Sequence, residues 1–197
     1  MIDGSERAGY DGLVVGGGDS TISWLILGGF AKAIYLLNGD GNEVVGNWIG
    51  LNPTGNGVEP NQTGVVVASA DNVVGPRNVI SGNTLDGVFI QAEGNTVEGN
   101  FIGTNEVCTT AQQSGCGLKL PNGRDGVRVG DFSAVTENVI AHNKQYGVDV
   151  VGEALSCVSQ ATKALARASG VPASPPGARV TCASSAIFSV AAGRLKR

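Results

Sequence analysis

Charged side chains are scarce in this chain of 197 residues, where they make up 15% of the sequence, and aromatic side chains make up only 5%. No cluster of lysine and arginine offers a footprint for phosphates, and the net charge of −4 also disfavours nucleic acid as a partner. No apolar run reaches the roughly 18 residues of a membrane-spanning helix. Residues 1–12 lack the basic and apolar regions of a signal peptide, so we expect either a removed leader or a fragment of a longer protein.

Histidine and cysteine are also rare. His142 is the only histidine, and it falls at a predicted turn, where a solvated side chain is the expected state. The four cysteines, Cys108, Cys116, Cys157 and Cys182, have no C-x-x-C spacing, so no zinc site is predicted. Cys108 and Cys116 bracket a short polar stretch, and they form either a disulfide in an oxidising compartment or two free thiols on a loop.

Glycine, by contrast, is abundant, with 31 residues, whereas the usual share is roughly 7%. Because there is no collagen period, this abundance predicts many tight turns. The sequence also repeats itself. Segment 42–52 (NEVVGNWIGLN) recurs at 95–105 as NTVEGNFIGTN, and segment 77–83 (RNVISGN) recurs at 137–143 as ENVIAHN. The smallest unit is about 21–23 residues long, which predicts a solenoid of stacked units.

Each unit contains three short apolar pieces separated by Gly, Asn, Asp and Ser. In the fourth unit these are 88–90, 96–98 and 101–103, which are too short for helices and favour strands. Three strands that return to their start make one coil, and coils stacked about 4.8 Å apart build a continuous core. The predicted inward columns are Leu13, Ile34, Val65, Val88, Val127 and Val148; Ile22, Val44, Val73, Val97 and Val135; and Leu27, Ile49, Ile80, Ile102 and Ile140.

Asparagines recur at fixed positions relative to these strands. Asparagine tolerates the left-handed backbone of a sharp bend, and stacked asparagine amides bond to the coils above and below. Three columns are predicted: Asn47, Asn78, Asn100 and Asn138 before the third strand; Asn52, Asn83, Asn105 and Asn143 after it; and Asn42, Asn72 and Asn95, with Ser20 and Ser133, before the second strand.

The blocks NxVxGNxIGxN, RNVISGN and DGVxI, together with the opening IDGSERAGYDG, resemble bacterial right-handed parallel β-helix repeat proteins, which share the fold of pectate lyases. The resemblance covers residues 2–151. It implies an all-β, right-handed solenoid, here of about five to six coils, and a secreted or cell-surface location. It implies little about activity, because this fold carries lyases, hydrolases, epimerases, adhesins and inert stalks.

The composition changes after the last repeat. We expect the repeat domain to cover 1–151, a short helix at 152–170 to cap the open end, and a disordered tail at 171–197. The tail ends in RLKR and is rich in Ala, Ser, Pro and Arg. Because the N-terminal residues show no polar cap, we also expect further β-helix coils to precede this segment in a longer parent chain.

Candidates for catalysis are few. The best stacked pair is Asp86 and Asp125, which hold equivalent positions on adjacent coils, about 5 Å apart. Two carboxylates are the minimum for glycoside hydrolysis by the usual route. Both residues precede glycine, however, and Asp-Gly is a turn signal, so a structural role is favoured. We therefore predict no catalytic residue, no metal and no cofactor, with a calcium ion at this pair as the alternative.

Two outward columns carry aromatic side chains that could stack on sugar rings. Tyr35 and Phe89 lie in the column of the first strand, and Trp48 and Phe101 lie in the column of the third. These four are the candidate ligand-binding residues. For the third strand the favoured explanation is different, namely that the insertions at 53–61 and 106–122 fold back and cover an apolar stripe.

These observations predict a non-enzymatic secreted or surface β-helix module with a structural or adhesive role and weak binding of a polysaccharide or cell-surface glycan. The alternative is a polysaccharide lyase or glycoside hydrolase that acts on acidic glycans and has catalytic coils partly outside this chain. An ice-binding solenoid would need regular ranks of threonine, which the sequence does not contain.

Overall fold

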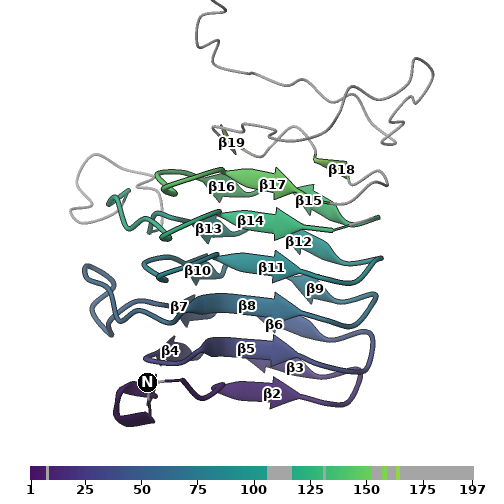
Figure 1. Ribbon diagram of the computed structural model, residues 1–197, viewed down its shortest axis with the longest axis horizontal. Coiled ribbons are helices and arrows are strands. Elements are labelled where there is room, and N and C mark those ends of the chain that lie inside the picture. Colours follow the sequence, from purple (N-terminus) through teal and green to yellow (C-terminus); the bar gives the residue numbers. More distant parts are fainter. Residues whose placement is uncertain (8, 106–116, 131, 152–156, 159–162, 165–197) are drawn as a thin grey trace, which may run out of the picture.

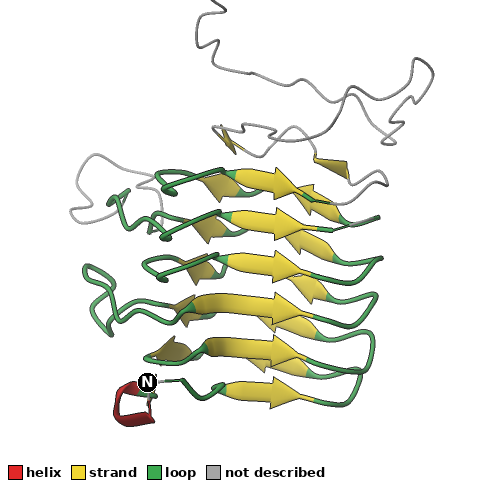
Figure 2. Cartoon of the chain, viewed as in Figure 1, coloured by secondary structure: helices red, strands yellow, loops and turns green. Residues whose placement is uncertain are grey.

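The computed structural model describes residues 1–197 except 8, 106–116, 131, 152–156, 159–162 and 165–197. The described chain is all-β: short strands form three parallel sheets, and each circuit of the chain lies on top of the previous one (Figures 1 and 2). In Figure 1 the chain crosses the near face from left to right, returns along the far side and rises with each circuit, which is a right-handed winding. The fold is a parallel β-helix.

Every coil contributes one strand to each sheet. Sheet 1 contains β2 (Leu13–Val15), β5 (Lys32–Leu36), β8 (Thr63–Val67), β11 (Val88–Ile90), β14 (Val127–Val129) and β17 (Val148–Val150). Sheet 2 contains β3 (Thr21–Ser23), β6 (Glu43–Val45), β9 (Val73–Val74), β12 (Thr96–Glu98), β15 (Ala134–Thr136) and β18 (Cys157–Val158). Sheet 3 contains β1 (Ile2–Asp3), β4 (Ile26–Gly28), β7 (Trp48–Ile49), β10 (Val79–Ile80), β13 (Phe101–Ile102), β16 (Val139–Ile140) and β19 (Lys163–Ala164). Five complete coils therefore run from β2 to β16.

The core is a set of straight aliphatic columns inside the solenoid. The registers pair Leu13 with Ile34, and so on up to Val127 with Val148, in the column predicted for sheet 1. The predicted column of sheet 3, from Leu27 to Ile140, is likewise in register and at most 1% exposed. A single coil cannot bury its apolar face, so this core exists only because neighbouring coils stack.

One inward residue was predicted wrongly. Val74, not Val73, pairs with Val44 and Val97 in sheet 2, and it is 1% exposed. The inward position lies two residues after the bend asparagine, here Asn72. The third coil has one extra residue between Asn72 and Asn78, six positions where the second and fourth coils have five, so the spacing from the ladder asparagine no longer agrees with the spacing from the bend asparagine. In a strand, an error of one residue exchanges the two faces.

The asparagine column before the third strands is a continuous hydrogen-bonded ladder. The amide nitrogen of Asn47 donates to Asn78 Oδ1 at 3.1 Å, Asn78 donates to Asn100 at 2.8 Å, and Asn100 donates to Asn138 at 3.0 Å. Each Oδ1 also accepts the backbone N–H of the preceding coil's asparagine. All four residues are at most 1% exposed. The ladder therefore satisfies the buried polar groups of each bend, which would otherwise be costly.

The column after the third strands differs from the prediction at two positions. Its members are Asn61, Asn83, Asn122 and Asn143, and hydrogen bonds of 2.9–3.0 Å join their side-chain amides. Asn52 and Asn105 lie outside it. Asn52 instead closes its own loop, since its N–H donates to Gly57 O, and Asn105 accepts the N–H of Leu118. Both insertions begin between the strand and the bend, so the ladder position comes after each insertion rather than before it.

The described residues of the segment predicted to form a capping helix are strands. Of the segment predicted as a capping helix, Cys157–Val158 and Lys163–Ala164 are strands that pair with β15 and β16. The helix prediction is wrong for these four residues, because the open edges of the last coil offer unpaired backbone groups that an added strand can satisfy. The remainder of 152–170 and the tail 171–197 lie outside the described residues.

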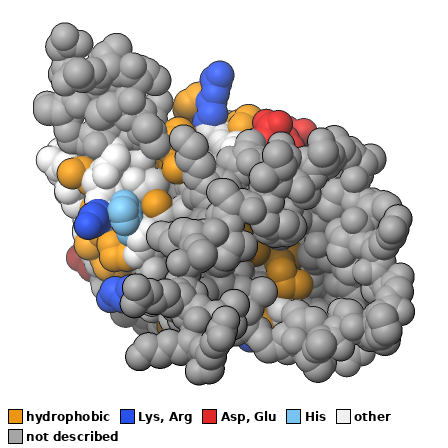
Figure 3. Space-filling view, turned by 90° about the horizontal axis from the view of Figure 1, so that it is seen from above, with side chains coloured by type: hydrophobic (Ala, Val, Ile, Leu, Met, Phe, Trp, Pro, Cys, Tyr) orange, Lys and Arg blue, Asp and Glu red, His pale blue; other side chains and the backbone are white. Residues whose placement is uncertain are grey.

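In the described chain the helical element is a single 3₁₀ turn, η1 (Ser5–Arg7), and no helix there is long and apolar enough to cross a membrane. Viewed along the solenoid axis (Figure 3), the described surface shows hydrophobic and charged side chains interspersed.

Candidate functional site

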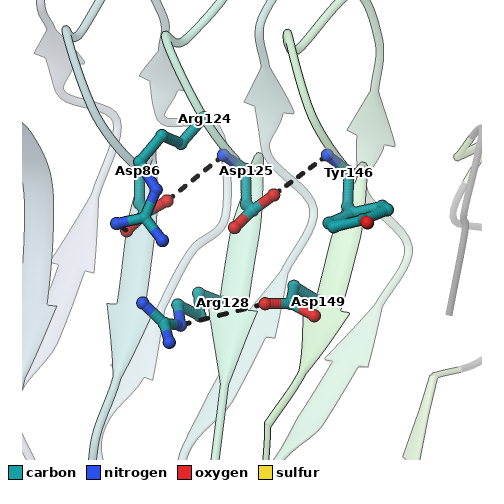
Figure 4. A network of polar contacts seen from close by, with 6 residues as sticks. All are labelled: Asp86, Arg124, Asp125, Arg128, Tyr146 and Asp149. Atoms are coloured by element: carbon teal, nitrogen blue, oxygen red, sulfur yellow. Dashed lines mark hydrogen bonds and ion pairs between the residues drawn. The ribbon is translucent and has the colours of Figure 1, made fainter. Parts of the chain in front are cut away.

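The two carboxylates that were the weak catalytic candidates are structural acceptors. Asp86 Oδ1 accepts the backbone N–H of Asp125 at 3.2 Å, and Asp125 Oδ1 accepts the N–H of Tyr146 at 2.9 Å (Figure 4). Asp86 is 3% exposed and Asp125 is 1% exposed. Each carboxylate thus ties one coil to the next at the start of sheet 1, in the way that the asparagines do elsewhere.

Two arginines balance part of the charge of this cluster. Arg124 Nη1 lies 3.5 Å from Asp86 Oδ2, and Arg128 Nε lies 3.8 Å from Asp149 Oδ2 (Figure 4). Burial raises the pKa of Asp86 above its usual value, and it outweighs the Asp125 N–H and Arg124, which both lower the pKa. Burial also raises the pKa of Asp149, and the negative charge of Asp125 adds to this shift.

The raised pKa of Asp86 predicts a pH-dependent effect of Asp86→Asn. The fold favours the protonated carboxyl, so this contribution to stability is present below the unfolded pKa of about 3.9 and is lost as the pH rises through the folded-state pKa. Asparagine does not titrate. We therefore expect the unfolding free energy of the wild type, minus that of the variant, to fall between pH values of about 4 and 7. Urea unfolding of both proteins at both pH values measures this difference in free energy. If the difference were the same at the two pH values, the pKa of Asp86 would not be raised in the folded state.

On sheet 1 the predicted aromatic residues already have partners. Lys32 Nζ lies 4.6 Å from the centre of the Tyr35 ring and 3.0 Å from Asp11 Oδ2. The Arg128 guanidinium lies 5.1 Å from the centre of the Phe89 ring. Val66 separates the two rings along the column. Cations therefore occupy faces of both rings, and the structure does not bring Tyr35 and Phe89 together into one site.

On sheet 3 the insertions cover part of the apolar stripe. Leu51, which lies just before the first insertion, and Leu120, from the second insertion, are 1% and 8% exposed and pack with Val79, which is 5% exposed. Trp48 and Phe101 flank this cluster and stay half-buried. The predicted cover is thus correct for Val79, whereas both aromatic rings keep a side that borders an open groove.

This groove lies beside sheet 3, where the chain bends out of sheet 2, and it has a volume of about 930 Å³. It spans the first four coils. The groove is lined by Trp24, Leu25, Ile26, Gly46, Trp48, Pro53, Pro76, Arg77, Val79, Gly99 and Phe101. Among these described residues Arg77 carries the single ionisable side chain, so the surface is mostly apolar and aromatic with one cationic donor.

The bend column explains how Trp24 and Arg77 reach the groove. We use this name for Trp24, Gly46, Arg77, Gly99 and Glu137, one residue per coil, each of which has a positive φ between 56° and 67°. Glycine adopts this conformation readily, whereas a bulky residue there is an outlier. Trp24 (φ 58°) is nevertheless 72% exposed. Its conformation costs on the order of 1–3 kcal/mol, and strain of this kind is found at functional sites.

Gly46, at the equivalent position of the next coil, leaves room for the indole of Trp24. A Cβ added to Gly46 would come within 3.0 Å of Trp24 Cε3 and Cζ3, so the indole lies directly over the backbone of Gly46. Pro76 lies over Gly99 in the same way, with its Cβ 2.9 Å from the position of an added Cβ. The column therefore alternates between residues with and without a side chain, and one ring from the preceding coil packs against each of Gly46 and Gly99.

Sequence analysis missed Trp24 and Arg77, although a signal was present. Both precede the ladder position of their coil, where the second and fourth coils have Gly46 and Gly99. A bulky residue in a column of bend glycines was the available clue. His142, by comparison, is exposed at a bend with φ 63°, as expected of a turn residue.

Metal ligands do not cluster in the described part of the chain, where no group of three or more His, Cys, Asp or Glu side chains could hold an ion together. Cys108 and Cys116 lie outside the described residues. No protein-family model matches the sequence, and no curated protein or solved structure matches it.

Proposed function

We propose that the chain is a non-enzymatic β-helix module, secreted or displayed at a cell surface, that binds a polysaccharide in the groove beside sheet 3. The observation that carries the proposal is the exposure of Trp24. Its side chain is 72% exposed, although its backbone has a positive φ that is unfavourable for a bulky residue. A fold that needed only a bend at this position would be better served by glycine, as Gly46 and Gly99 show.

The chemistry of the groove suits a sugar. Pyranose rings have apolar C–H faces and polar edges, and aromatic rings bury the faces while nearby donors bind the hydroxyls. Trp24, Trp48 and Phe101 supply the rings, and Arg77 supplies the donors. Mostly apolar concave surfaces with a few polar groups are typical of ligand sites. Location outside the cytoplasm is supported only by the resemblance of the repeats to bacterial β-helix proteins.

Binding should depend on Trp24 and not on the bend itself. We expect Trp24→Gly to weaken binding to the recognised polysaccharide by about tenfold, since losing an aromatic contact removes on the order of 1.4 kcal/mol. The variant should fold, because glycine prefers the conformation at this position. Affinity electrophoresis in gels that contain single polysaccharides measures the effect.

The matched control is Glu137→Gly. Glu137 belongs to the same bend column, has φ 56°, and does not line the groove. Its substitution should leave the migration in every gel unchanged. If Trp24→Gly and the wild type migrate alike in all polysaccharide gels, the groove is not the binding site and the proposal fails.

We also expect no cleavage of polygalacturonate or other acidic glycans, with or without added calcium. Cleavage needs a positioned acid and base. Asp86 and Asp125 are buried acceptors of backbone N–H groups, and Arg77 is the one ionisable residue that lines the groove. Assays for unsaturated products and for reducing ends test both reactions. Cleavage that disappears in both Asp86→Asn and Asp125→Asn would establish these residues as a catalytic site instead.

A further inference from the structure

We infer that the groove takes a linear, ribbon-shaped polysaccharide of 1,4-linked rings with equatorial bonds, lying lengthwise along the solenoid axis with about one ring per coil. This inference rests on the proposed function and specifies its ligand. Its starting point is the direction of the groove. Trp24 comes from the first coil, Trp48 from the second, Arg77 from the third and Phe101 from the fourth.

These four residues hold successive levels along the axis. Backbone bonds connect the levels: Trp24 N donates to Val45 O, Gly46 N donates to Pro76 O, and Arg77 N donates to Gly99 O. Parallel coils are separated by about 4.8 Å. A chain of pyranose rings joined through equatorial bonds at C1 and C4 is extended, and each ring advances it by about one coil spacing. The groove therefore offers one contact level for each of four consecutive rings.

The alternation in the bend column adds a second match. Trp24 packs against Gly46, and Pro76 packs against Gly99, so a ring packed against a glycine of the next coil returns every second coil, or about every 10 Å. In a ribbon of this type, alternate rings are turned over, so the same ring edge also returns every second ring. Polymers with axial 1,4 bonds bend into helices and lack this relation to a straight row of contacts.

The bend between sheets 1 and 2 shows that the alternation by itself is a packing rule. There Asp19 and Asp71 alternate with Gly41 and Gly94, and an added Cβ on either glycine would approach the aspartate Oδ1 to 2.6 or 2.3 Å. Aspartate tolerates a positive φ. What distinguishes the groove side is that a tryptophan and an arginine fill these positions, and that both line a hollow.

Arg77 is the specificity-determining residue for the third ring. Its guanidinium has five N–H donors. Among the residues that the structure describes, no carboxylate lies within ion-pair distance of it. It can therefore donate to ring hydroxyls. Removal of this side chain should affect only ligands long enough to reach the third coil.

The experiment is isothermal titration of the full chain with two series of glucose oligomers, one β-1,4-linked and one α-1,4-linked, starting from a single ring. We expect the affinity for the β series to rise with each ring to about four rings and then level off, by at least about tenfold in total. The α series should stay near the affinity of its shortest member. Arg77→Gly should reduce the affinity for the four-ring β oligomer by about tenfold and leave the two-ring oligomer unchanged, with Glu137→Gly as the control.

Four outcomes would overturn the inference. Equal affinity for the two series, or no gain beyond one ring, would remove the lengthwise ribbon while Trp24-dependent binding, and with it the proposed function, remained. If the wild type bound no glycan at all, both the inference and the proposed function would fail. A dimer in light scattering that Trp24→Gly abolishes would show that a second copy of the chain occupies the groove.

Discussion

Replacing Asn100 with alanine is expected to lower the free energy of unfolding by about 3 kcal/mol, because an unsatisfied buried polar group costs about 1–3 kcal/mol and several are created together. The Asn100 amide donates to Val74 O at 2.8 Å and to Asn138 Oδ1 at 3.0 Å. Its Oδ1 accepts the backbone N–H and the side-chain amide of Asn78. Alanine removes all four bonds at a position that is 1% exposed, where water cannot replace them.

Asn56→Ala is the matched control for this prediction. Asn56 is exposed in the loop that follows β7, where it contacts Thr54 Oγ1. Surface changes of this kind usually stay within about 0.5 kcal/mol. Urea unfolding of both variants gives the comparison, and equal denaturation midpoints would show that the ladder does not hold the coils together.

Replacing Gly50 with alanine is expected to destabilise the chain by about 3 kcal/mol or more. Gly50 follows β7 with φ 90°, a conformation that alanine rarely adopts. An added Cβ would also lie 2.2 Å from the carbonyl oxygen of Ser81 in the next coil. Since that oxygen belongs to the backbone, relief requires two coils to separate, which breaks ladder bonds on both sides. Backbone strain and overpacking are each worth about 1–3 kcal/mol.

Gly16→Ala separates this effect from the general cost of losing a glycine. Gly16 is exposed just after β2, its φ is not in the positive region, and an added Cβ would meet nothing within 4 Å. This variant should unfold within about 0.5 kcal/mol of the wild type. Thermal or urea unfolding distinguishes the two. If both glycines tolerated alanine equally, the coils would not be in the close contact that the structure shows.

The wrong assignments at Val73, Asn52 and Asn105 have one origin. Each lies next to a place where a coil gains residues: one residue between Val74 and Asn78 in the third coil, and the two insertions after β7 and β13. Periodicity gives the phase within an unbroken repeat. It does not state on which side of a ladder position the extra residues are placed, because that depends on which backbone groups the neighbouring coil leaves to be paired.

In the candidate site, too, the sequence pattern predicts the direction of a side chain but not its surroundings. Trp48 and Phe101 could be named from alternation along their strands, and they line the groove, whereas Tyr35 and Phe89 satisfy the same pattern and have cations over their rings. The pattern states that a side chain points outward. Whether it then meets a loop, a cation or an open hollow depends on segments that are distant in the sequence, such as the loop that carries Pro53.

The solenoid, its coil length, two of its three inward columns and the ladder from Asn47 to Asn138 could be predicted from the sequence, since these follow from local spacing repeated in register. The position of the groove, the place of Trp24 and Arg77 at its border, and the burial of Asp86 and Asp125 as acceptors became visible in the stacked coils. The physical reason is stacking. Period and bend chemistry are properties of one coil, whereas a seat for an indole, a covered stripe or a buried carboxylate is made by several coils together.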